Sequence, residues 1–196
     1  MDINRAVLVV VDMQLGFVHP NSEYVVPRVV DLVKRWSDAG GALIFTRFLN
    51  WADSPFERFF SWSALMNSPQ TDLIPELEPY AASAIVVDKP FYTLFTAEGE
   101  QAISAGGWTD LVICGLTTES CVLKTAVDTF ERHLTPWVVT DASATHAGQH
   151  AHEAGLLVIS RFIGRGQLVT LADVALSPGV VEITADQTPV VHNIVA

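Results

Sequence analysis

Short runs of apolar, mostly β-branched residues recur along the chain, separated by segments whose apolar positions have helical spacing. A continuous apolar run of four to six residues is typical of a strand that is buried on both faces, as in a parallel sheet. We therefore expect strands at residues 6–11, 42–46, 84–87, 111–114, 135–140 and 167–170.

Amphipathic helices are expected between these strands, at residues 29–36, 93–105, 122–130 and 151–162. The glycine pairs at 40–41 and 106–107 are typical helix ends. Alternating strands and helices predict an α/β fold, with a parallel sheet between helices and right-handed crossovers. A length of 196 residues fits one domain, so we treat residues 1–196 as a single domain.

The charge and hydropathy of the chain exclude several classes of partner. Its formal net charge is -11 with only 11 lysines and arginines, which disfavours nucleic acid and anionic membranes. The apolar runs are too short to span a bilayer, and the first residues lack the basic flank of a signal peptide. We expect a cytoplasmic protein with a small-molecule substrate or a protein partner.

A strand-to-helix turn makes one cysteine a candidate nucleophile. The run 111–114 stops at Gly115, and an apolar helical face starts at Val122, which places Cys121 in the first helical turn with Thr117 or Thr118 as its cap. The positive end of a helix dipole favours a thiolate there. The alternative is a buried core cysteine, and the spacing leaves both open. The only other cysteine, seven residues before Cys121, fits no zinc or disulfide pattern, so both are expected to be free thiols.

Two more charged residues stand at predicted strand ends. Asp12 follows the first strand, where it is either a general base or a cap for the next turn. Lys89 follows the third strand, and Pro90 keeps it extended. An isolated lysine is normally a solvated surface charge, so only its position after a buried strand suggests chemistry.

Three other features leave alternatives open. The aromatic segment 51–62 indicates a pocket wall, a lid or a subunit interface, or else a satellite core under a loop. His146, His150 and His152 suggest a metal site, but no carboxylate or cysteine completes a ligand set, and we expect no metal. The first strand lacks a following glycine trio, which disfavours a dinucleotide. The tail 178–196 is expected to be an arm over the chain's own body or over a neighbour.

The segments VVVDMQLGF, VVDKPFYTLF and CGLTTESCV together resemble the isochorismatase-like cysteine hydrolases, over roughly residues 6–162. The resemblance implies a three-layer α/β/α sandwich whose six-stranded parallel sheet has the order 3-2-1-4-5-6. It also implies that Asp12, Lys89 and Cys121 meet as a catalytic triad at the switch point of that sheet.

The resemblance also implies a mechanism. A thiolate of Cys121 would attack a carbonyl to form an acyl-thioester, and Asp12 would pass the thiol proton to the leaving nitrogen. The backbone N–H groups of Thr117 and Cys121 would hold the oxyanion, with a cis peptide between Leu116 and Thr117. No cofactor is implied.

The residues after the second strand bear on the substrate. Family members that hydrolyse nicotinamide carry metal-binding histidines there, whereas this chain has none. Candidate substrate-binding residues are Gln14 and Phe17 after the first strand and Arg47, Asn50 and Trp51 after the second. For Arg47, a structural salt bridge is the alternative. The resemblance thus favours an amidase for a small amide, carbamoyl or ureide substrate. The alternatives are a catalytically idle relative that binds a metabolite or partner, and a vinyl-ether hydrolase of the isochorismatase type.

We also expect the protein to form a homo-oligomer, either a dimer or a tetramer, through apolar surface. The aromatic segment 51–62 and the apolar tail 190–196 are unusual for a monomer, and the mean hydropathy of +0.32 is high.

Overall fold

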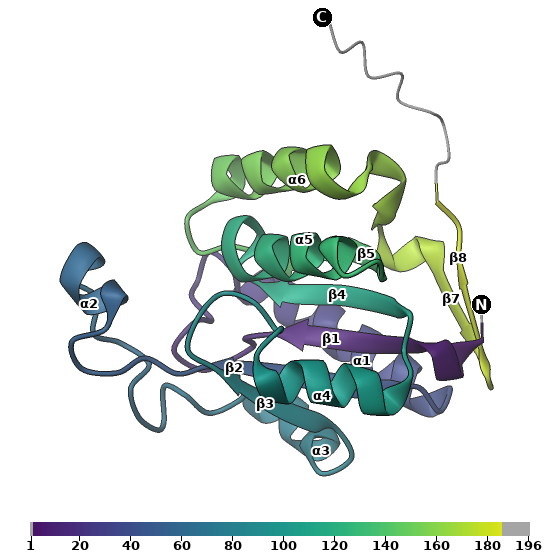
Figure 1. Cartoon of the computed structure of the whole chain (residues 1–196), viewed down its shortest axis with the longest axis horizontal. Helices are drawn as coiled ribbons and strands as arrows, with labels where there is room; N and C mark the ends of the chain where they lie inside the picture. Colours follow the sequence, from purple (N-terminus) through teal and green to yellow (C-terminus); the bar gives the residue numbers. More distant parts are fainter. Residues whose placement is uncertain (1, 186–196) are drawn as a thin grey trace, which may run out of the picture.

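The computed structural model describes residues 2–185, and its centre is a six-stranded parallel sheet of order β3-β2-β1-β4-β5-β6 (Figure 1). This sheet confirms the predicted strand order and pairing. Its strands are β1 (Ala6–Val11), β2 (Ala42–Phe48), β3 (Ile85–Lys89), β4 (Asp110–Leu116), β5 (Thr135–Ala144) and β6 (Leu168–Val169).

Helices cover both faces of the sheet, so the fold has three layers (Figure 1). One face packs against α1 (Val26–Asp38) and the segment leading into α3 (Glu78–Ala81). The other face packs against α4 (Ala97–Gly106), α5 (Leu123–Glu131) and α6 (Gln149–Ile163). Short 3-10 turns lie at Ile3–Arg5, Glu23–Val25, Pro75–Leu77, Arg165–Gln167 and Leu171–Asp173.

The continuous apolar run of β1 follows from this layering. Successive side chains of a strand point to opposite faces. Leu8 and Val10 enter the core under α1, whereas Val7, Val9 and Val11 enter the core under α4, α5 and α6. All six residues of β1 are buried, because neither face of the central strand meets water.

Some elements differ from the sequence-based expectation. The helix predicted at 93–105 begins only at Ala97, where the Thr96 side chain accepts a hydrogen bond from Gly99 N. Sequence reasoning also missed α2 (Pro55–Phe60) and α3, because elements of six and four residues are too short to show a helical period.

The first part of the predicted arm contains β8 (Val180–Ile183), which forms an antiparallel hairpin with β7 (Val174–Ser177) just before the arm. It packs on the chain's own start, since Val180 bridges Asp2 and Ile3 N donates to Gly179 O. Residues 186–196, the rest of that tail, lie outside the described residues. No helix within residues 2–185 is both long and apolar enough to cross a membrane.

The sheet order also determines where a site can form. β1 and β4 are neighbours, but their connections lead to opposite halves of the sheet, which makes their carboxyl ends the topological switch point. The two strands are paired up to Val11 and Gly115. A Cβ at Gly115 would lie 2.2 Å from Val11 O, and its φ is +112°, so only glycine permits this approach.

We therefore expect Gly115→Ala to lower the free energy of unfolding by at least about 3 kcal/mol, or to prevent folding, because both backbone strain and a clash oppose it. Gly107→Ala is the matched control, since Gly107 also has a positive φ but no atom lies within 4 Å of the place that an added methyl group would occupy. That change should cost only about 1–2 kcal/mol, the usual strain of an L-residue in the left-handed region. Urea denaturation measures both, and equal losses would contradict the close approach of β1 and β4.

Candidate active site

Three predicted residues meet at the carboxyl edge of the sheet. Asp12 follows β1, Lys89 is the last residue of β3, and Cys121 lies in a π-helical turn, Thr118–Val122, after β4. Lys89 Nζ lies 2.7 Å from Asp12 Oδ2 and 3.4 Å from Cys121 Sγ. All three side chains are buried. The structure therefore brings together the three residues that the sequence indicated separately.

The ammonium group of Lys89 has an acceptor for each of its three hydrogens. Besides Asp12 and Cys121, it donates to Phe91 O at 3.0 Å. A buried charge needs such complete pairing. Burial alone would lower the pKa of Lys89, but the nearby Asp12 carboxylate and Cys121 sulfur outweigh it and raise the pKa. Lys89 is thus a cation at neutral pH.

Asp12 is held by a residue that sequence reasoning missed. Thr46 Oγ1 donates to Asp12 Oδ1 at 2.6 Å and accepts from Asp12 N at 3.1 Å. Asp12 also has a φ of 49°, which is uncommon for a residue other than glycine and is found often at functional sites. The position of Thr46 at the carboxyl end of β2, beside the end of β1, was the available signal.

The environment of Cys121 differs from the expected helix terminus. Thr117 makes no side-chain cap, and the hydroxyl of Thr118 lies 2.8 Å from His152 Nδ1 instead. Burial raises the pKa of the Cys121 thiol to about 12; Lys89 lowers it, and Asp12 raises it. The pKa of the Cys121 thiol is therefore raised rather than lowered, because the cost of burying a charged sulfur exceeds the help from Lys89.

The backbone before Cys121 has the geometry that the family resemblance implied. The peptide bond between Leu116 and Thr117 is cis. Thr117 and Cys121 both line the same cavity. The assignment of their N–H groups to an oxyanion hole stays a prediction.

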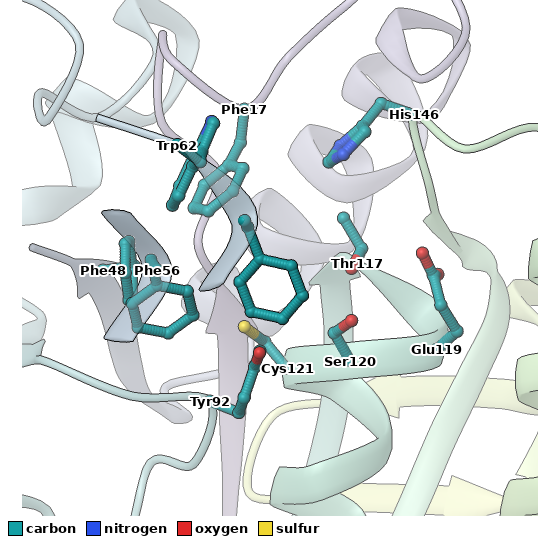
Figure 2. Close-up of a pocket in the computed structure, with 11 residues that line it drawn as sticks. Phe17, Phe48, Phe56, Trp62, Tyr92, Thr117, Glu119, Ser120, Cys121 and His146 are labelled. Carbon is teal, nitrogen blue, oxygen red and sulfur yellow. The ribbon is translucent and has the colours of Figure 1, made fainter. Parts of the chain in front are cut away.

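A cavity of about 340 Å³ opens over Cys121 (Figure 2). One side is aromatic, and its rings contact one another, as in the edge-on pair of Phe48 and Phe56 at 4.9 Å. The other side is polar. The aromatic lining residues are Phe17, Phe48, Phe56, Phe60, Trp62 and Tyr92, and the others are Thr117, Glu119, Ser120, Cys121 and His146. The segment 51–62 therefore supplies part of a pocket wall, one of the roles considered for it.

Of the five candidate substrate-binding residues, only Phe17 lines this cavity. Arg47 instead forms a two-point ion pair with Asp88, at 2.7 and 2.8 Å, because the two residues are register partners on β2 and β3. Trp51 lies edge-on to Phe91 and is partly exposed. Arg47 thus forms the structural salt bridge that was its alternative role, and neither Arg47 nor Trp51 lines this cavity.

Gln14 and Asn50 are buried and are used to fix loops. The Gln14 amide accepts from Phe48 N and donates to the carbonyl groups of Phe48 and Thr71. The Asn50 amide donates to two carbonyl groups of residues 62–64, and its oxygen accepts from Trp51 N and Ser54. Both side chains therefore hold the cavity wall in place rather than line it.

For several lining residues, the sequence pattern gave little or no indication that they would line a cavity. Phe48 belongs to a strand that also reads as core, and Tyr92 and His146 come from irregular segments. Glu119 and Ser120 stand beside Cys121 in the turn, and this adjacency was the one usable signal. Their positions at the cavity depend on how separate loops pack, which no local pattern reveals.

The three histidines do not form a ligand set. His146 lines the cavity, whereas His152 is bonded to Thr118. Within residues 2–185, no three side chains of histidine, cysteine, aspartate or glutamate are grouped so that they could hold a metal ion. Catalysis without a metal remains a prediction.

A family model for the isochorismatase domain matches residues 6–172. The chain belongs to the isochorismatase family. This family assignment confirms the resemblance of the three segments around Asp12, Lys89 and Cys121, and it identifies the chain as an isochorismatase-like hydrolase.

Relatives of the chain include a biosynthesis protein as well as amidohydrolases. The chain is 26% identical over 159 residues to a phenazine biosynthesis protein PhzD of Pseudomonas fluorescens, covering 76% of each. It is 34% identical over 94 residues to ureidoacrylate amidohydrolase RutB of Serratia proteamaculans, covering 47% of this chain and 38% of that one. The crystal structure of N-carbamoylsarcosine amidase from Thermoplasma acidophilum has the same fold, with a TM-score of 0.71, 24% identity and coverage of 80% and 93%.

The raised pKa of Cys121 predicts how its alkylation depends on pH. With a pKa of about 12, the thiolate fraction is about one in 10⁵ at pH 7 and grows tenfold with each pH unit. The rate of iodoacetamide labelling at Cys121, located by peptide mass spectrometry, should therefore rise without a plateau from pH 6 to pH 10. The fully buried Cys114 is the internal control and should stay unlabelled. A plateau between pH 6 and pH 8 would show a depressed pKa instead.

Proposed function

We propose that this isochorismatase-family hydrolase is a cysteine amidohydrolase that cleaves the C–N bond of a small amide, carbamoyl or ureide substrate through an acyl-thioester. The observation that carries the proposal is the buried Lys89, which bridges Asp12 and Cys121 at the base of the cavity. The names of the ureidoacrylate amidohydrolase and the N-carbamoylsarcosine amidase support this reaction class.

In the first half-reaction, Asp12 removes the thiol proton as Cys121 Sγ attacks the substrate carbonyl carbon. Proton transfer accompanies the attack because the resting thiol is neutral. The N–H groups of Thr117 and Cys121 stabilise the oxyanion. Asp12 then gives the proton to the leaving nitrogen, the C–N bond breaks, and a thioester remains on Cys121.

In the second half-reaction, a water molecule attacks the thioester carbonyl, and Asp12 accepts its proton. The C–S bond breaks, and the sulfur regains a proton from Asp12 as the acid leaves. Lys89 stays protonated throughout, since its pKa is raised, and compensates the negative charge on either Asp12 or Cys121.

We expect Cys121→Ala to lower kcat on any amide substrate by at least about 10⁴-fold, because it removes the covalent route. A panel of small amides, carbamoyl compounds and ureides, assayed by ammonia release, identifies the substrate. Mass spectrometry of the quenched wild-type enzyme should then show an acyl group on Cys121. Thr125→Ser, in the helix after Cys121, is the control variant. It is expressed and purified in the same way as Cys121→Ala and should retain most activity. Turnover by Cys121→Ala above a few per cent of wild type would exclude the thioester route.

We also expect that dialysis against EDTA leaves turnover unchanged, because the proposed steps use only side chains and backbone N–H groups. Activity before and after chelation is the measurement. Loss of activity that zinc or iron restores would overturn this expectation and would require His19 and the histidines at 146, 150 and 152 to be tested as ligands.

A further inference from the structure

One residue that lines the cavity carries a buried polar atom without a partner. Glu119 lines the cavity, and its Oε1 accepts a hydrogen bond of 2.7 Å from Thr145 Oγ1. Its Oε2 is buried and is the only such side-chain nitrogen or oxygen without a hydrogen-bond partner in residues 2–185. Burying an unpaired carboxylate oxygen is costly, so such an atom calls for an explanation.

No protein cation neutralises Glu119 in this part of the structure. Burial lowers the pKa of His146, and His19 lowers it further, although Glu119 opposes them. Burial also lowers the pKa of His152, whose Nδ1 is engaged by Thr118. Both imidazoles are therefore neutral at pH 7. Among the described residues that line the cavity, none is a lysine or an arginine.

The opposite side of the cavity suits a flat cation. Most of its aromatic rings lie across the cavity from Glu119 (Figure 2), and Phe17 also stacks on the His146 ring with centroids 6.4 Å apart. Phe17 stacks on Trp62 with ring centroids 6.0 Å apart, and Phe48 stacks on Trp62 at 5.7 Å. The faces of aromatic rings attract cations, most strongly in a site shielded from water. A carboxylate on one side and ring faces on the other favour the same ligand charge.

Glu119 is also close to Cys121 along the chain, because it lies two residues earlier in the same π-helical turn. A ligand group that pairs with Glu119 is therefore held near the sulfur. A substrate carboxylate at that place would meet the Glu119 carboxylate, and no lysine or arginine is among the described residues that line the cavity.

We propose that Glu119 is a specificity-determining residue that binds a positively charged nitrogen of the substrate, so that the substrate is a cationic amide with a flat apolar body. This inference rests on the proposed amidohydrolase function for its reaction and on the Glu119 pocket for its substrate class. The class differs from ureidoacrylate and N-carbamoylsarcosine, both of which are carboxylates.

Three benzamides of one shape and different charge test the inference in the wild-type enzyme. They are 4-(aminomethyl)benzamide, which is a cation, 4-(hydroxymethyl)benzamide, which is neutral, and 4-carbamoylbenzoate, which is an anion. We expect kcat/KM for the cation to exceed that for the neutral compound at least tenfold, with the anion lowest. The difference should lie mainly in KM, because the charge of the substrate changes how tightly it binds in the ground state rather than the rate of the chemical step.

Variants of Glu119 distinguish charge pairing with the substrate from a purely structural role of this residue. Glu119→Gln should bring the ratio of cationic to neutral kcat/KM to within about threefold of one, whereas Glu119→Asp, which keeps the charge, should retain a preference for the cation. Glu98→Gln is the matched control, because it removes one charge from an exposed position on α4. It should leave the ratio at its wild-type value. A ratio near one in the wild type, or one that Glu119→Gln does not change, overturns the inference.

Binding without turnover keeps the two proposals distinguishable. Calorimetry with benzylammonium, benzyl alcohol and benzoate should show benzylammonium binding at least tenfold more tightly, and Glu119→Gln should remove that advantage. If the amides are cleaved through Cys121 without charge preference, the amidohydrolase proposal stands and the Glu119 inference fails. If none is cleaved but benzylammonium binds through Glu119, Glu119 is established as a binding residue for a cationic nitrogen, and the assignment of an amide substrate falls together with the support for the amidohydrolase proposal. If benzylammonium shows no preference and nothing is cleaved, the inference fails.

Discussion

The candidate site depends on one buried ion pair, between Asp12 and Lys89 at the carboxyl edge of the sheet. Neither side chain has any exposed surface, so both charges have lost their water. Such a pair contributes little net stability, because desolvation costs about as much as the attraction returns. It is tolerated here because Thr46 Oγ1 bonds the second oxygen of Asp12 and because the Lys89 ammonium has three acceptors. Its position beside Cys121 is best explained by chemistry rather than by stability.

Because of this ion pair, the proposed proton transfer from Cys121 to Asp12 leaves the net charge of the buried site unchanged. Before the transfer, Asp12 is negative and Cys121 is neutral; afterwards, the charges are exchanged. Lys89 Nζ lies 2.7 Å from one and 3.4 Å from the other, so one cation serves both states. The buried site therefore never holds an uncompensated charge, which would be costly at low dielectric. A high resting pKa of Cys121 is compatible with nucleophilic attack for this reason.

The sequence predicts the part of this arrangement that depends on strands. The unbroken apolar run of β1 indicates a strand buried on both faces, and the positions of Asp12 and Lys89 at strand ends place them at one edge. The approach of these two residues to Cys121 came from the family resemblance. The pairing of Arg47 with Asp88 could not be predicted, because strand register is not visible in either strand alone. The direction of the Cys121 pKa shift depends on burial, which is a tertiary property.

Most of the aromatic wall is held by a different part of the fold from the reacting groups. The triad is fixed by the ends of β1 and β3 and by the turn after β4, all supported by the two large cores on the sheet. The aromatic wall instead belongs to a small separate cluster of Phe48, Phe56 and Leu65, with Phe17 and Trp62 packed against it. Figure 1 shows α2, which carries part of this wall, standing away from the sheet. Because α2 and Trp62 lie outside the sheet, this part of the wall can change its shape with little cost to the sheet, whereas a change at Asp12 or Lys89 would leave a buried charge unpaired. The proposed role of Glu119 places part of the substrate preference in the same turn that carries Cys121, across the cavity from most of the aromatic wall.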